Sequence, residues 1–153
     1  MNIDLSKEQT EQIARHLNNI LSDEYLLFTK LFKYHWNVTG PFFGPLHALF
    51  QAQYEELFKV IDETAERARA LGEIAFGTLQ EFHQHSRLKE HPGTNPKAEE
   101  MIADLVHDHE AIIRHLRSDI DVIENLRDEG TVDFLTGLLK QHEKMAWLLR
   151  AHL

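Results

Sequence analysis

The segment HWNVTGPFFGPLHALFQAQYEELFKVIDETAE, residues 35–66, decides the fold. Two Gly-Pro pairs near its start predict a turn between two helices. After this turn, apolar residues recur with helical spacing from about Leu46 to Leu71, and Gly72 is a typical helix stop. The same segment holds four potential metal ligands, namely His35, His47, Asp62 and Glu66.

The four ligands fall into two pairs. Asp62 and Glu66 are four residues apart, so they share one helical face about 6 Å apart along the axis. Such a pair of carboxylates can hold a hard or borderline cation. His35 closes the first helical run and His47 opens the second, so the turn can bring both imidazoles to one corner. The 15 residues from His47 to Asp62 span roughly 22 Å of helix, which one metal cannot bridge.

Two interpretations remain. The pairs are unrelated, or the carboxylates of one subunit meet the histidines of another across a two-fold axis, which builds two such sites at once. Taken singly, His35 is typical of a hydrogen-bonded core residue, His47 of a helix start, and Asp62 and Glu66 of a solvated face. We favour the second interpretation because of the family resemblance described below.

The rest of the chain predicts an all-α fold of four long helices. Ser6 or Asp4 caps the first helix, with Gln9 completing a capping box after Ser6. A long crossover follows Gly72. The remaining start signals are Thr78 for a short helix over 78–86, Asn95-Pro96 for the third long helix, which ends at Gly130, and Thr131 for the fourth. Bundles of this kind commonly hold metals between their helices.

Composition excludes several classes of protein. The 153 residues predict one domain, 1–153, and the absence of cysteine excludes a disulfide framework and a cysteine-type zinc site. A net charge of −9 disfavours generic nucleic-acid binding. No apolar stretch is long enough for a transmembrane helix. Residues 1–5 resemble neither a signal peptide nor a basic tail, so we expect a cytoplasmic location and no membrane contact.

The chain resembles the Dps family, the dodecameric miniferritins. The likeness rests on Tyr34-His35-Trp36-Asn37 with Gly40, on Leu46-His47, Tyr54 and Asp62-Glu63-Thr64-Ala65-Glu66-Arg67, on Thr78-Leu79-Gln80-Glu81-Phe82, and on the closing helix around Trp147. The sequence contains no Glu-x-x-His pair, the usual ligand pattern of a di-iron bundle within one chain. The resemblance therefore agrees with a metal site built in another way.

What the resemblance implies is specific. It implies a ferritin-like four-helix bundle and a ferroxidase centre with His35 and His47 from one subunit and Asp62 and Glu66 from its partner. This centre would oxidise Fe(II), preferentially with hydrogen peroxide rather than oxygen. Ferric mineral would be stored in a hollow dodecameric shell, which protects against oxidative stress. Trp36, a packing residue, would also lie beside the iron as an electron donor.

The resemblance also implies acid-lined pores at three-fold axes for iron passage. Asp133 fits the family position best, and Asp128 and Glu129 lie at the same junction between the last two helices. An acidic ring would raise the local concentration of cations. The competing interpretation is that these residues only keep a loop soluble.

Two other functions compete with iron oxidation. One is a nucleoid protein that condenses DNA. Family members that bind DNA often use a Lys-rich tail, which this sequence lacks, so we expect weak or absent DNA binding. The other is an inert helical oligomer whose motif residues are structural. The sequence leaves open an accessory metal role for further histidines, namely His83, His85, His91, His107 and His109.

Overall fold

The computed structural model describes residues 3–153, and this range contains five α-helices. They are α1 (Lys7–Asn37), α2 (Phe43–Ala70), α3 (Leu79–His85), α4 (Ala98–Asn125) and α5 (Glu129–Arg150). The prediction of an all-α fold is confirmed. The expectation that residues 1–5 form neither a signal peptide nor a basic tail includes Met1 and Asn2, which lie outside the described residues.

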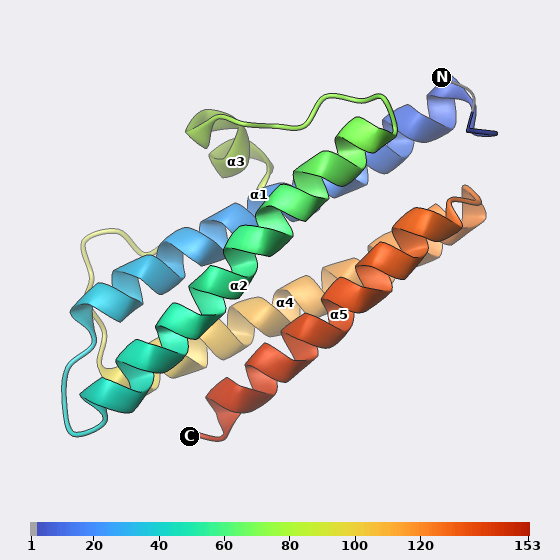
Figure 1. Ribbon diagram of the computed structural model, residues 1–153. Helices are drawn as coiled ribbons and strands as arrows, with labels where there is room; N and C mark the ends of the chain where they lie inside the picture. Colours follow the sequence, from blue (N-terminus) through green and yellow to red (C-terminus); the bar gives the residue numbers. More distant parts are fainter. Residues whose placement is uncertain (1–2) are drawn as a thin grey trace.

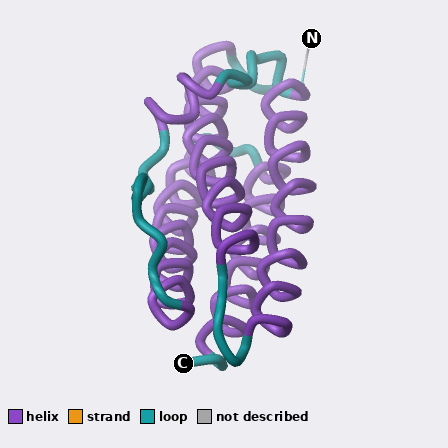
Figure 2. Tube along the Cα trace, turned by 90° about the vertical axis from the view of Figure 1, so that its left-hand side faces the viewer, coloured by secondary structure: helices purple, strands orange, loops and turns teal. Residues whose placement is uncertain are grey.

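The four long helices form a bundle of two hairpins. Figure 1 shows α1 beside α2 and α4 beside α5, each pair antiparallel. The crossover from 71 to 97 returns along the bundle, so that α2 and α4 run in the same direction. It carries α3 and follows the outside of the bundle (Figure 2). Among the described residues, no helix is both long enough and apolar enough to cross a membrane.

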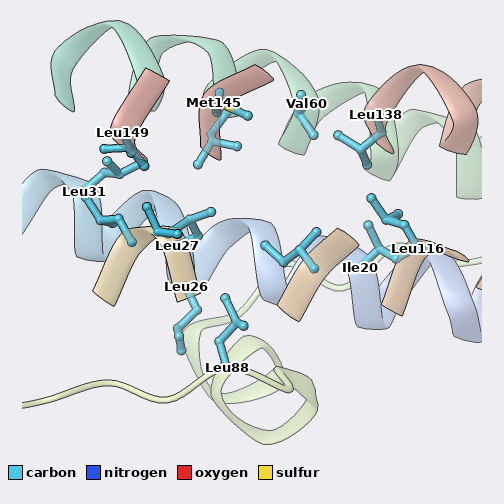
Figure 3. Close-up of a cluster of buried hydrophobic side chains, with 14 of the residues drawn as sticks. Ile20, Leu26, Leu27, Leu31, Val60, Leu88, Leu116, Leu138, Met145 and Leu149 are labelled. Carbon is cyan, nitrogen blue, oxygen red and sulfur yellow. The ribbon is translucent and has the colours of Figure 1, made fainter. Parts of the chain in front are cut away.

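Leucine and isoleucine side chains fill the space between the hairpins. In Figure 3, Leu27 and Leu31 of α1 point toward Met145 and Leu149 of α5, and all four are buried. Leu26 points the other way and meets Leu88 of the crossover (Figure 3). Burying such side chains contributes about 1.5–3 kcal/mol each. The apolar stripe of each helix therefore holds both the hairpins and the crossover in place.

The local start and stop signals work as the sequence predicts at three helix ends. Ser6 caps α1, and its hydroxyl and the Gln9 side chain form a reciprocal capping box. Thr78 and Glu81 form the same arrangement at α3. After α2, Gly72 has a φ of +85° and donates its N–H to the carbonyl of Arg69, which ends the helix in a left-handed cap.

Three predicted helix starts are wrong. The helix expected from Leu46 begins at Phe43, because the first turn has no N–H partners and so tolerates Pro45. The helix expected at Asn95-Pro96 begins at Ala98, where the Glu100 carboxylate accepts from the backbone N–H of Lys97 over 2.9 Å.

The third error concerns α5. Its cap is Asp128, not Thr131, because the Asp128 carboxylate accepts from the backbone N–H of Thr131 over 3.1 Å. The helix therefore begins at Glu129, earlier than the sequence signal indicates.

Candidate metal centre

The end of α1 and the start of α2 hold two histidines in a reciprocal pair. The Nδ1 atom of His35 lies 2.8 Å from the backbone carbonyl oxygen of His47, and Nδ1 of His47 lies 2.8 Å from the carbonyl oxygen of His35. The two rings stack with centroids 3.7 Å apart and planes 18° apart. The predicted corner of two imidazoles is therefore present.

This pairing fixes the tautomer of both rings. A carbonyl oxygen can only accept, so each Nδ1 carries the proton and donates it. In the neutral form of each ring, Nε2 then carries the lone pair. A histidine that donates one ring N–H to a carbonyl while the other nitrogen is free has the arrangement found in metal-ligating histidines. His35 and His47 are thus oriented as a pair of nitrogen ligands.

One aromatic ring packs against each histidine of the pair. Phe43 stacks on His47 with centroids 5.0 Å apart, and Tyr54 meets His35 edge-on at 5.3 Å and 83°. Trp36 is 69% exposed, and its ring stacks on Phe32 at 5.1 Å and 13°. Trp36 thus lies next to His35 in the chain, while its ring packs along α1.

The carboxylate pair lies farther along α2. Asp62 and Glu66 are both exposed. Across residues 3–153, no hydrogen bond or ion pair engages either side chain. Asp62 lines a surface groove that it shares with Phe58 of α2 and Leu79 of α3. Both carboxylates are therefore free to bind a cation or a partner.

The described residues of one subunit do not by themselves assemble a metal site. In the described part of the chain, no group of three or more histidine, aspartate or glutamate side chains is placed to hold a metal ion. This agrees with the helical spacing between His47 and Asp62. The histidine pair lies at the turn of the α1–α2 hairpin, and the carboxylate pair lies farther along α2 of the same hairpin.

A partly exposed aromatic strip joins the two places. From Trp36 the aromatic contacts continue through Phe32 and Phe28 to Phe58, with centroid distances of 5.1, 4.5 and 6.2 Å. Phe58 is 65% exposed and borders the groove of Asp62. We name this surface, made of Phe28, Phe32, Trp36 and Phe58, the aromatic strip. Phe28 and Phe32 are half-buried, whereas Trp36 and Phe58 are exposed at the two ends of the strip. Exposed apolar side chains that gather in this way mark interaction sites.

The three pore candidates have different surroundings. Asp128 is buried, and besides capping α5 it binds the guanidinium of Arg67 over 2.8 Å. Glu129 and Asp133 are exposed and line a surface pocket together with Arg127. Asp128 therefore has a structural role in the subunit, whereas Glu129 and Asp133 present free carboxylates to solvent.

The additional histidines are dispersed. His83 and His107 are exposed, and His91 lies 3.4 Å from a carboxylate oxygen of Asp104. His109 is fully buried and contacts His142. Because none belongs to a group that could hold a metal within residues 3–153, the structure gives no accessory centre.

A four-helix bundle whose second and third long helices are joined by a long lengthwise crossover is typical of the ferritin-like class. The protein-family model for the ferritin-like domain matches residues 14–153 of this chain. The chain belongs to this family, and within it to the Dps proteins, as its relatives show.

Three of these relatives illustrate the likeness. An uncharacterised low-temperature-induced protein of Nostoc is 47% identical over 99% of this chain and 85% of its own length. DNA protection during starvation protein 2 of Bacillus anthracis is 37% identical, covering 94% of this chain and 97% of its own. The solved Dps structure from Vibrio cholerae, described as a ferritin-like diiron-carboxylate protein, superposes with a TM-score of 0.92 at 28% identity, covering 99% and 95%.

Proposed function

We propose that this chain is the subunit of an iron-oxidising and iron-storing miniferritin. His35 and His47 of one subunit and Asp62 and Glu66 of its partner bind Fe(II) as substrate, and hydrogen peroxide is the preferred oxidant. The ferric product is stored as mineral inside a hollow shell of twelve subunits. The diiron-carboxylate character of the Vibrio relative supports iron as the metal.

The observation that carries this proposal is the division of free ligands on one hairpin. Two oriented imidazole nitrogens lie at one end, and two unpaired carboxylates lie farther along α2. The aromatic strip lies between the two pairs, and an interface with another subunit would shield its apolar side chains from water. A two-fold interface is self-complementary, so a second copy laid antiparallel on this strip brings each histidine pair to a carboxylate pair and completes two centres.

The chemistry of the donor set fits the substrate. Imidazole nitrogen and carboxylate oxygen together suit Fe(II), and a set of few protein ligands leaves positions for water or peroxide. Two Fe(II), one hydrogen peroxide and two protons give two Fe(III) and two water molecules. A sparse ligand set also releases Fe(III), which can then move to the mineral.

Mixing two inactive variants tests whether the centre is shared. One variant is His35→Ala/His47→Ala, and the other is Asp62→Ala/Glu66→Ala. Each alone should oxidise Fe(II) much more slowly than the native protein. Reassembled in equal amounts, they should recover about a quarter of native activity, because half of the dimers are mixed and each mixed dimer has one intact centre of two. Stopped-flow absorbance after addition of peroxide measures the rate.

The matched control is Glu63→Gln, which removes a neighbouring charge on α2 and should leave oxidation unchanged. If the mixture stays as inactive as its components, although mass measurements show mixed oligomers, the centre is not shared. If the Asp62→Ala/Glu66→Ala variant oxidises iron as fast as the native protein, the four residues are structural.

Storage is a separate measurement. Fe(II) is added without oxygen to the native-size oligomer, hydrogen peroxide follows, and the iron that elutes with the protein is determined. Many irons per subunit should stay with the shell, and replacing peroxide by dissolved oxygen should slow the oxidation. Precipitation of ferric iron outside the protein would refute storage. Analytical ultracentrifugation of the same sample tests the number of subunits.

A further inference from the structure

We propose that Tyr54 is an electron donor to the iron centre and that Phe32 connects it to Trp36. This inference rests on the proposed function. It starts from the position of Tyr54 on α2, two helical turns after His47 and on the same helical face. Tyr54 is half-buried and directs its ring at His35, edge-on, with centroids 5.3 Å apart.

The two oxidisable rings near the centre differ in their contacts. Trp36 stacks on Phe32 and is largely exposed, and the structure gives it no ring contact with either histidine. Tyr54 contacts both His35 and Phe32, the latter at 4.4 Å and 39°. Tyr54 is therefore the redox-active side chain that packs directly against an iron-ligating ring, and Trp36 lies one ring beyond Phe32.

These contacts form one continuous path. It runs from His35 to Tyr54, then to Phe32, and ends at the exposed ring of Trp36. Phenylalanine resists oxidation, so Phe32 acts only as a packed bridge between a phenol and an indole. An oxidising equivalent that reaches Tyr54 can thus pass to Trp36, within the strip that the second copy covers, without leaving as a free radical.

The reaction requires such a donor when only one Fe(II) occupies a centre. Reducing hydrogen peroxide to water takes two electrons, and one Fe(II) supplies one. With Tyr54 as the second donor, Fe(II), H2O2, the phenol and one proton give Fe(III), the tyrosyl radical and two H2O. The phenolic hydrogen is lost as a proton and an electron, and both end in water. A later Fe(II) and one proton restore the phenol, giving Fe(III).

The experiment detects the radical itself. The native oligomer is loaded without oxygen with one Fe(II) per centre, mixed with hydrogen peroxide, freeze-quenched and examined by electron paramagnetic resonance. The chain has three tyrosines, so single variants can assign the signal. Tyr54→Phe should lose the tyrosyl signal and increase the hydroxyl radical captured by a spin trap. Tyr25→Phe, whose ring instead stacks on Phe82, is the matched control and should keep the signal.

Trp36→Phe provides the second readout. Removing the end of the path should leave the tyrosyl signal in place and lengthen its lifetime. A tyrosyl signal that survives in Tyr54→Phe, or iron oxidation in the native protein with no tyrosyl signal, overturns the assignment to Tyr54 while the ferroxidase stands. A native protein that does not oxidise Fe(II) at all overturns both proposals.

Discussion

The Nδ1 atoms of His109 and His142 lie 2.9 Å apart in the centre of the bundle, and neither ring is exposed to solvent. The two rings belong to α4 and α5 and join a longer chain of hydrogen bonds. Gln53 of α2 contacts the other nitrogen of His109, and Glu24 of α1 contacts the other nitrogen of His142. Each long helix thus contributes one polar side chain to the core.

The donor and the acceptor of the hydrogen bonds at His109 can be assigned by starting from Gln53. The Gln53 amide donates to the backbone carbonyl of Met145 over 3.1 Å, so its oxygen accepts from Nε2–H of His109. Burial, and then the neighbouring His142, lower the pKa of His109 well below its usual value of about 6.5, which keeps this ring neutral. Nδ1 of His109 therefore accepts a hydrogen bond from Nδ1–H of His142.

Stability should fall on acidification because of His109. Below pH about 6.5 the unfolded chain binds a proton at this histidine, whereas the folded chain does not. The contribution of neutral His109 to the free energy of unfolding is present in full above the pKa of this histidine in the unfolded chain, and it is lost as the pH falls below that pKa. His109→Gln keeps a donor and an acceptor but cannot titrate. Between about pH 7.5 and 5.5, its free energy of unfolding should depend less on pH, by up to about 1.4 kcal/mol per pH unit.

Denaturant unfolding at constant protein concentration provides the measurement. The control is His107→Gln, which removes an exposed histidine of the same helix and should keep the native pH dependence. Identical pH dependence in the native protein and His109→Gln would show that His109 is not kept neutral by the core.

A second stability prediction concerns Asp128. Its carboxylate caps α5 and binds Arg67 of α2, so that one side chain joins the two hairpins. Asp128→Ala removes the cap and leaves the guanidinium of Arg67 without its carboxylate. We expect a loss of about 2–3 kcal/mol in the free energy of unfolding. Asp133→Ala, at an exposed position of the same helix, should change stability little, and equal losses in both variants would contradict the assignment.

The sequence predicts features that depend on local chemistry. The capping boxes at Ser6 and Thr78 form as predicted, because each needs only residues within one turn. The cap of α5 is equally local, because Asp128 accepts from the N–H of Thr131 three residues later, and the prediction from the sequence was Thr131 instead. Only the contact of Asp128 with Arg67, 61 residues away in the chain, could not be predicted locally. Tertiary contacts of this kind leave no signal in a local pattern.

The site shows the same division. Spacing alone predicts that His35 and His47 share a corner and that the carboxylates lie elsewhere. The reciprocal bonds that orient both rings require the three-dimensional turn. The sequence analysis missed the polar chain in the core. A signal for it exists, because His109 and His142 lie on the apolar stripes of their helices, four residues after Leu105 and Leu138 respectively.

Iron uptake should depend on the exposed carboxylates at the start of α5. Glu129 and Asp133 line one surface pocket, and we propose that three copies of it surround a pore in the assembled shell. Glu129→Gln/Asp133→Asn should slow the uptake of Fe(II) into the native-size oligomer and weaken its dependence on ionic strength, because an acidic ring concentrates cations. The rate of oxidation at low and at high salt provides the measurement, and Glu143→Gln, on the same helix, is the control. Unchanged rates and salt dependence would exclude this route.

DNA binding by the native protein should be weak or absent at physiological salt. Affinity for duplex DNA comes mainly from lysine and arginine side chains that displace counterions from the phosphates. This chain has 25 acidic and 16 basic residues, and a shell multiplies its net charge of −9 by the number of subunits. Buried or ion-paired basic residues, such as Lys30 with Asp104 and Arg67 with Asp128, add nothing to a phosphate-binding surface.

A gel-shift titration of the iron-free oligomer with linear duplex DNA at about 0.15 M ionic strength tests this prediction. We expect no shifted band at protein concentrations at which the same sample oxidises iron. The titration is repeated at about 0.01 M ionic strength, where screening is weakest and any residual attraction is largest. A discrete complex at the higher salt would contradict the prediction and would make DNA condensation a second function of the shell.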